Sequence, residues 1–434
     1  MAYLSRQLQS AYALHMAQKI HSLDSELGAV RGTSALVIQA VQGITDLVEE
    51  MHGAISGLAL PLVGKNAKAR KTRGITGLVY RSVRGITGVV NWGIERSLDV
   101  AQMPAVSKAL APATKQLAAK LKLKSAEPYR ETVKAAANGV LGDKLAALRN
   151  PLAIQMQFRQ RGLPLQASTI ASGKLLILAH GLCMNDLQWL RDGHDHGAML
   201  AEQFGYEPIY LHYNTGRKIA ENGADFAELI ERTLQDWPVP ITELVIIGHS
   251  MGGLLARSAC HQALLSKHAW VKKLSKLITL GTPHAGAPLE RAGRGIDFVL
   301  GMSPYTAPFA RLGLVRSAGI QGLRDGAVTP AGELPLFPKH VKLYTLACTK
   351  QKAPALPQKV PALKDKTDLA APLRRLLGDG LVTVKSALAS EDKPALGLPL
   401  RIPASRQAVV YETDHFEMLG SQSVAKHLLR WLKA

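Results

Sequence analysis

The chain has 434 residues, of which 47% are apolar, 20% are charged and only 3 are cysteines. This is globular composition, which excludes wholesale disorder, a collagen-like fibre and a disulfide-stapled miniprotein, and the sparse cysteines suit the cytoplasm. Lys and Arg outnumber Asp and Glu by 53 to 33, and the resulting net charge of +20 favours polyanionic partners such as anionic lipid headgroups.

The first predicted domain, residues 1–165, is helical and basic. Its apolar residues recur at helical spacing, as at Ile44, Leu47 and Met51. The tripeptide Gly-Ile-Thr begins at positions 43, 74 and 85, and the last two copies are close to three helical turns apart. Equivalent side chains of these copies would therefore lie on nearly one helix face.

Basic side chains concentrate between Lys65 and Lys124, where only Glu95 and Asp99 are acidic. We favour a helix-packing interface for this domain over a helix lying on an anionic membrane. Nucleic-acid binding is disfavoured, because no zinc-finger or RNA-recognition signature is present and aromatic residues make up only 5%. The apolar stretch 51–64 is too short to span a bilayer, and the N-terminus is a poor secretory signal.

The second predicted domain, residues 166–434, alternates apolar runs with helical stretches. Short continuous apolar runs are typical of strands buried on both faces, and strand–helix alternation predicts an α/β fold with a mostly parallel sheet. The predicted strands are Lys174–His180, Pro208–Tyr213, Leu244–Ser250, Leu277–Pro283, Val341–Cys348 and Gln407–Tyr411. The clearest helical stretches are Asn222–Trp237 and Gly252–Leu265.

The segment Gly248-His-Ser-Met-Gly-Gly253 ends a predicted strand and opens a predicted helix. A Gly-x-Ser-x-Gly pattern in that setting predicts a sharp turn that presents Ser250 as a nucleophile. The N–H of Met251, at the helix N-terminus, is free to stabilise an oxyanion. A structural turn without catalytic function is the weaker interpretation.

The first predicted strand ends in His180-Gly181-Leu182, and the loop after it would supply the second oxyanion donor, the N–H of Leu182. We expect His180 to shape this loop and not to act as the base. His180, Gly181, His249 and His284 are the residues expected to border the substrate.

A nucleophilic serine needs a base, and the base needs an orienting acid, in the chain order Ser, acid, His. His415 follows the last predicted strand and precedes a C-terminal helix, so it is the predicted base. Asp379, between two glycines, is the predicted acid. The alternatives fit less well: Asp414 adjoins the histidine, Asp365 and Asp368 lie in a basic stretch, and His261, His268 and His427 look helical or peripheral.

These segments resemble the α/β-hydrolase lipases and esterases. Residues 171–434 resemble the bacterial serine esterases grouped with the alpha/beta domain of GPI inositol-deacylases. The resemblance is carried by HGLCMNDLQW (180–189), LHYNTGRKIAENG (211–223), GHSMGGLLARSA (248–259), LGTPHAGAPLER (280–291), GDGLVTVKSAL (378–388) and DHFEML (414–419). The resemblance implies a Ser250–His415–Asp379 triad with Leu182 and Met251 as oxyanion donors.

About 285–340 the chain holds a long insertion rich in Gly, Pro and aromatic residues, which predicts a lid or cap over the site. An apolar cap beside a basic domain favours a lipid-like ester substrate. A thioesterase, a polyester depolymerase or an acyltransferase on the same fold remains open, as does a non-catalytic adaptor that binds a membrane or a partner.

No cofactor is expected. GHSMGG lacks the Gly-x-Gly start of a dinucleotide-binding loop. The run His194-Asp195-His196 looks like a set of metal ligands, but adjacent residues alternate in direction and no further ligand lies at a motif spacing. We therefore predict no metal site.

Overall fold

The computed structural model describes residues 127–166, 172–286, 317–330, 333–353, 378–390 and 402–433. By its contacts the chain divides into two units, Met1–Ser125 with Arg149–Leu152 and Ala126–Leu148 with Ala153–Ala434. The description below concerns the second unit. The Gly-Ile-Thr copies and the basic stretch 65–124 lie outside the described residues.

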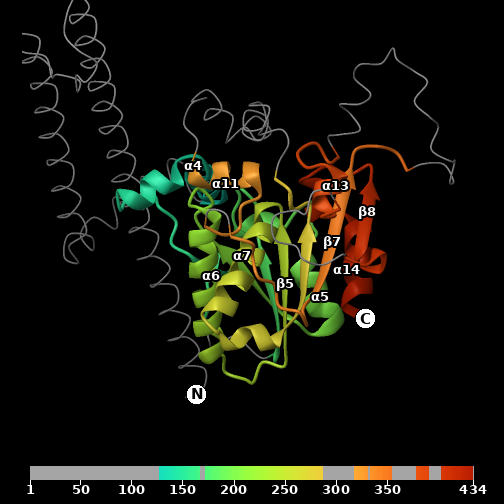
Figure 1. Ribbon diagram of the computed structural model, residues 1–434, viewed down its shortest axis with the longest axis horizontal. Helices are drawn as coiled ribbons and strands as arrows, with labels where there is room; N and C mark the ends of the chain where they lie inside the picture. Colours follow the sequence, from blue (N-terminus) through green and yellow to red (C-terminus); the bar gives the residue numbers. More distant parts are fainter. Residues whose placement is uncertain are drawn as a thin grey trace, which may run out of the picture. The chain divides into compact units, whose positions relative to one another are not determined.

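An eight-stranded sheet with the order β2-β1-β4-β3-β5-β6-β7-β8 forms the centre of this unit (Figure 1). Strands β3 to β8 run parallel, whereas β1 pairs antiparallel with both β2 and β4. The strands are β1 (Gln157–Gln160), β2 (Leu163–Pro164), β3 (Lys174–Ala179), β4 (Glu207–His212), β5 (Glu243–His249), β6 (Leu274–Leu280), β7 (Lys342–Thr349) and β8 (Gln407–Tyr411).

Helices cover both faces of the sheet. The α-helices are α4 (Glu127–Ala147), α5 (His196–Phe204), α6 (Ile219–Gln235), α7 (Met251–Leu265), α11 (Ala318–Asp325), α13 (Val384–Ala387) and α14 (Gln422–Lys433). The 3₁₀ turns are η3 (Asp186–Trp189), η4 (Ala269–Lys273), η5 (Ala404–Arg406) and η6 (Glu417–Leu419). Helices α6 and α7 pack on one face, while α5 and α14 pack on the other.

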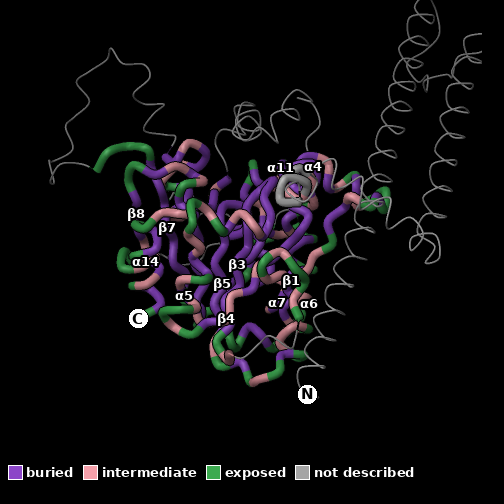
Figure 2. The backbone as a smooth tube through the Cα atoms, turned by 180° about the vertical axis from the view of Figure 1, so that it is seen from behind, coloured by how far each residue is buried: buried purple, intermediate pink, exposed green. Residues whose placement is uncertain are grey.

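The central strands are apolar at successive positions because each of their faces meets a helix layer. Leu175 and Ile177 of β3 belong to the core under α6 and α7, whereas Leu176 and Leu178 belong to the core under α5 and α14. The centre of the sheet is therefore buried throughout (Figure 2). This is why continuous apolar runs, without alternation, predicted strands correctly.

All six predicted strands are confirmed, with ends that shift by a few residues. The two predicted helical stretches are α6 and α7, and the C-terminal helix is α14. The sheet also includes β1 and β2, which lie on the N-terminal side of the predicted boundary at 165. Leu163–Pro164 is a two-residue strand at the edge of the sheet, and Gln157–Gln160 beside it is short and mostly polar, so neither carries a buried-strand signal.

Local chemistry explains where several helices begin and end. Asp195 caps α5 by accepting a hydrogen bond from the N–H of Ala198, and Gly205 ends the helix in the left-handed region. Helix α7 is different, because most of its residues are buried, including Arg257. The helix after Ser250 is thus embedded in the core and fixes the turn that precedes it.

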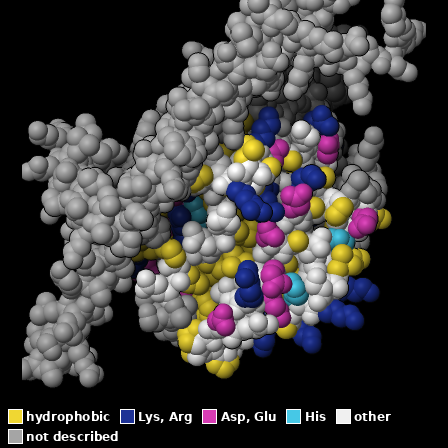
Figure 3. Space-filling view, turned by 90° about the vertical axis from the view of Figure 1, so that its left-hand side faces the viewer, with side chains coloured by type: hydrophobic (Ala, Val, Ile, Leu, Met, Phe, Trp, Pro, Cys, Tyr) yellow, Lys and Arg dark blue, Asp and Glu magenta, His cyan; other side chains and the backbone are white. Residues whose placement is uncertain are grey.

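Charges of both signs mix on the described surface. On the face in Figure 3, basic and acidic side chains are interspersed with apolar ones. Exposed ion pairs along α6, such as Lys218–Glu221 and Arg232–Glu228, add to this mixture. In the part of the chain that the structure describes, no helix combines the length and apolarity needed to cross a bilayer.

The predicted cap is described only in part. Residues 317–330 contribute α11, whose N-cap Ser317 accepts from the N–H of Ile320. Residues 287–316 and 331–332 of this insertion lie outside the described residues. Residues 354–377, farther along the chain, also lie outside them.

Candidate active site

Ser250 occupies a strained turn between β5 and α7. Its backbone has φ 54° and ψ −121°, a conformation that costs a non-glycine residue on the order of 1–3 kcal/mol. The surrounding structure enforces this conformation: the Ser250 N–H donates to the carbonyl of Leu280 at 2.8 Å, and Thr282 Oγ1 donates to the Ser250 carbonyl at 2.9 Å. A Cβ at Gly252 would lie 2.2 Å from the carbonyl oxygen of Ala179, so the turn requires glycine there.

Two backbone N–H groups beside Ser250 have no acceptor among the described residues. In the loop after β3, the N–H of Cys183 donates to Thr215 Oγ1 and that of Met184 to the Gly181 carbonyl, but the N–H of Leu182 has no such partner. The N–H of Met251, at the first position of α7, also has no acceptor among the described residues. Because buried N–H groups are almost always paired, these two are suited to bind an oxyanion.

Asp379 and His415 are brought together from two different loops. Nδ1 of His415 donates to Oδ2 of Asp379 over 2.7 Å, and the two side chains are only 2% and 1% exposed. Oδ1 of Asp379 accepts from the N–H groups of Leu381 and Val382, each at 2.9 Å. The carboxylate is therefore fixed by its own turn, and the proton on Nδ1 leaves Nε2 of His415 able to accept one.

His249 links the serine turn to the base. Its Nε2–H donates to the carbonyl of His415 at 2.9 Å, and the two rings lie 4.8 Å apart. Burial is the main reason that the pKa of His249 lies well below its usual range, and the neighbouring His415 lowers it further. Ser250 and His415 share no direct hydrogen bond in this structure, a common finding where substrate is not bound.

Gly181 and His180 border the serine. A Cβ at Gly181 would lie 3.0 Å from Cβ of Ser250, so a side chain here would crowd the nucleophile. The His180 ring stacks on Tyr213, and its Nδ1–H donates to the Gly181 carbonyl at 3.0 Å. Burial lowers the pKa of His180 to about 3, so the ring is neutral and shapes the loop.

His284 lies in the interior beside α7. Nη1 of Arg257 lies 3.1 Å from its Nδ1, and Thr279 Oγ1 lies 3.1 Å from its Nε2. Both ring nitrogens thus have polar neighbours in the interior, and the expected contact with substrate stays a prediction. The position of His284 after a strand could not reveal these neighbours, because the sequence does not show that α7 buries Arg257.

The side chains of His194 and His196 contact each other. Nε2 of His194 is 2.9 Å from Nδ1 of His196, whose Nε2–H donates to the Met418 carbonyl. Arg191 and His194 form an isolated antiparallel β-bridge. This bridge turns the chain back on itself next to the contact between the two imidazole rings. Among the described residues, no group of three or more His, Cys, Asp or Glu side chains is arranged to hold a metal ion.

Four buried histidines predict acid sensitivity. Burial lowers the pKa of His180 to about 3 and of His196 to about 4, and it holds the pKa values of His249 and His284 well below the usual range. Below about pH 6.5 the unfolded chain binds protons that the folded chain does not, so folding stability falls as the pH falls. We expect the melting temperature to drop steadily from about pH 6.5 to about pH 4.5. A constant melting temperature over that range would contradict these assignments.

The strand order, the parallel sheet and the strained serine turn together define the α/β-hydrolase fold. Residues 193–324 match the family model described as "PGAP1-like alpha/beta domain". That match includes Ser250 and ends before Asp379 and His415.

Solved structures similar to this chain include lipases and esterases. The Bacillus licheniformis lipase BlEst2 in mature form has 18% identity and a TM-score of 0.38, over 63% of this chain and 98% of that chain. Its propeptide form has 19% identity and a TM-score of 0.39, over 60% of this chain and only 51% of that chain. The Pyrococcus furiosus esterase Pf2001 has 13% identity and a TM-score of 0.36, over 60% and 83%. No curated protein matches the chain significantly.

Proposed function

We propose that the protein is a serine hydrolase that cleaves carboxylic esters. Ser250 is the nucleophile, His415 the general base and Asp379 the acid that orients it. The observation that carries this proposal is the 2.7 Å hydrogen bond between His415 and Asp379. This hydrogen bond lies beyond the carboxyl ends of the parallel strands, where the strained Ser250 turn and the two N–H groups without an acceptor among the described residues also lie. A turn with a purely structural role would not need the hydrogen bond, the strained serine and the two N–H groups together.

The reaction proceeds through an acyl-enzyme. Nε2 of His415 takes the hydroxyl proton while Oγ of Ser250 attacks the ester carbonyl, and the N–H groups of Leu182 and Met251 hold the developing oxyanion. The protonated imidazole then gives its proton to the leaving alcohol as the ester C–O bond breaks. Water, deprotonated by His415, attacks the acyl-enzyme, and Ser250 recovers its proton as the carboxylic acid leaves.

An amphiphilic, lipid-like ester fits the apolar surroundings of this site. Leu182 and Met251 belong to one apolar cluster with Ile219 of α6 and with Ile320 and Leu323 of α11. An acyl chain beside such side chains would gain roughly 0.8 kcal/mol for each methylene removed from water. The basic domain, residues 1–165, would bring the enzyme to anionic surfaces where such esters occur.

A panel of p-nitrophenyl esters from acetate to laurate tests this proposal. We expect kcat/KM to rise by about fourfold for each added methylene until the apolar surface is filled. A matched octanoyl thioester should be the poorer substrate. Preference for acetate would contradict a lipid-like substrate, and turnover of the thioester alone would contradict the ester assignment. Anionic vesicles, compared with zwitterionic ones, should increase the rate if the basic domain meets membranes.

A further inference from the structure

Helix α4 lies directly behind the loop that carries Leu182. Val140 of α4 belongs to the apolar cluster that contains Leu182 and Met251, the two proposed oxyanion donors. A Cβ at Gly139 would lie 2.1 Å from Sγ and 3.0 Å from Cα of Cys183, which follows Leu182. Cys183 itself has φ 59°, so the loop is strained at the residue that α4 contacts.

The same helix is bonded to α11, the described part of the predicted cap. Oγ of Ser317 donates to the Gly139 carbonyl at 2.7 Å, and the N–H of Ala318 donates to Oδ2 of Asp143 at 3.0 Å. On its other side, Nδ2 of Asn214 donates to the Gly142 carbonyl at 2.8 Å. Helix α4 thus joins three loops that surround the proposed site.

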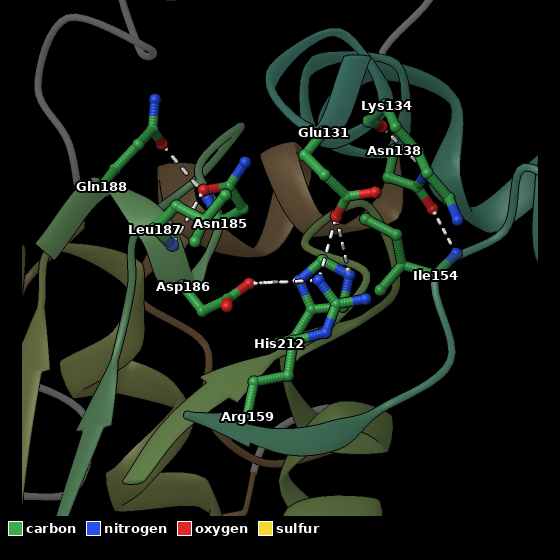
Figure 4. A network of polar contacts seen from close by, with 10 residues as sticks. All are labelled: Glu131, Lys134, Asn138, Ile154, Arg159, Asn185, Asp186, Leu187, Gln188 and His212. Carbon is green, nitrogen blue, oxygen red and sulfur yellow. Dashed lines mark hydrogen bonds and ion pairs between the residues drawn. The ribbon is translucent and has the colours of Figure 1, made fainter. Parts of the chain in front are cut away.

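A buried charge network extends this contact to the far end of the loop (Figure 4). Nη1 of Arg159, on β1, lies 2.9 Å from Oε2 of Glu131 on α4 and 3.4 Å from Oδ1 of Asp186. Asp186 begins η3, directly after the loop. Nδ1 of His212 lies 2.9 Å from the same carboxylate oxygen, although its orientation does not meet hydrogen-bond geometry, so this contact is electrostatic.

Two opposing effects act on the pKa of Asp186. Burial alone would raise it, but the contact with His212 and the neighbouring Arg159 outweigh burial, so that the pKa is lower than usual. Its side chain is only 2% exposed. Removing a partner from such a buried network leaves a charge without compensation, so the network holds its members in place.

We propose that α4 is the positioning element of the oxyanion loop. It holds the N–H of Leu182 in place through the close contact of Gly139 with Cys183 and through the Glu131–Arg159–Asp186 network. The proposal rests on the proposed esterase function, since the held group is one of its oxyanion donors. The role of α4 is one of positioning, because none of its residues touches the reacting atoms.

The close contact is tested by Gly139→Ala, alone and combined with Cys183→Gly. Alanine is a better helix former than glycine, so a loss of helix propensity in α4 does not explain a loss of activity. We expect Gly139→Ala to lower kcat by about 10- to 100-fold with little change in KM, because a small displacement of the donor affects the transition state most. The Cys183→Gly background lacks the Sγ that the added methyl group would meet at 2.1 Å and leaves the approach to Cα at 3.0 Å, so the same change should lower kcat there by less than about threefold.

Equal losses of kcat in both backgrounds, or no loss in either, would overturn the role of the contact between Gly139 and Cys183.

The network is tested by Glu131→Gln, with Glu228→Gln as the control, since Glu228 is an exposed carboxylate of α6 that pairs with Arg232 and His268 and has no hydrogen bond or ion pair with the loop among the described residues. Glu131→Gln should lower kcat at unchanged KM, while the control should match the wild type. An equal effect of the two variants would contradict the network's role.

Hydrogen exchange separates this inference from the esterase proposal, because it requires no turnover. The amides of residues 183–190 should exchange faster in Gly139→Ala and Glu131→Gln than in the wild type, with the rest of the sheet unchanged. If the wild type hydrolyses no ester and the loop still loosens, the esterase function fails and the positioning contact stands. If the wild type is active and neither kcat nor exchange changes, the inference fails alone.

Discussion

Replacing Ser250 with alanine is expected to lower kcat for ester hydrolysis by about a millionfold. Without the hydroxyl there is no acyl-enzyme, and the oxyanion donors alone provide only a small residual rate enhancement. The fold should remain intact, since the Ser250 side chain makes no hydrogen bond in the structure and alanine accepts the same backbone strain at similar cost. Steady-state kinetics and a thermal melt on the same preparation measure both effects.

The matched control is Ser258→Ala, on the helix that follows Ser250. Ser258 is fully buried, and its hydroxyl has no hydrogen-bond partner among the described residues, so its removal should leave activity near the wild-type value. Full esterase activity in Ser250→Ala would contradict the nucleophile assignment. An equal loss in the control would point to damage to α7 instead.

Asp379→Asn is expected to lower kcat by about ten-thousand-fold at neutral pH. Oδ1 of Asp379 accepts from two backbone N–H groups, so the asparagine oxygen would keep that place and its NH₂ group would face His415. Nδ1 of His415 would then have to accept, and its proton would move to Nε2. An imidazole protonated at Nε2 cannot take the proton of Ser250.

Asp414→Asn provides the matched control, because it removes a negative charge from the residue adjacent to His415. Its Oδ1 accepts from the N–H groups of Phe416 and Glu417, and it does not contact the imidazole. We expect less than about a tenfold loss of kcat, since the tautomer of His415 is unaffected. The choice of acid would be wrong if Asp414→Asn lost as much activity as Asp379→Asn.

The sequence was most informative where one local rule determines the structure. Continuous apolar runs located the buried strands, and Gly-x-Ser-x-Gly after such a run located the turn at Ser250. The strands β1 and β2 were not found, because both are short and neither carries a continuous buried apolar run. The surroundings of His284 could not be predicted for a related reason: they depend on Arg257, a charged residue that the helix buries.

The contacts around the oxyanion loop could not be predicted, since they join residues that only the sheet brings together. Arg159 reaches Asp186 because β1 turns antiparallel onto β4, and no local pattern records that pairing. A glycine such as Gly139 within a helix gives no local sign of what it contacts. The structure explains it as the position where the helix approaches the loop most closely.

A fluorophosphonate probe followed by peptide mass spectrometry tests the central claim most directly, because the probe reacts with a serine only when a base and an oxyanion site activate it. We predict a single adduct, on Ser250, which forms rapidly in the wild type and in Asp414→Asn and far more slowly in Asp379→Asn. A protein that is folded and remains unlabelled, or one that is labelled at another residue, would contradict the assignment of Ser250, His415 and Asp379 as one catalytic unit.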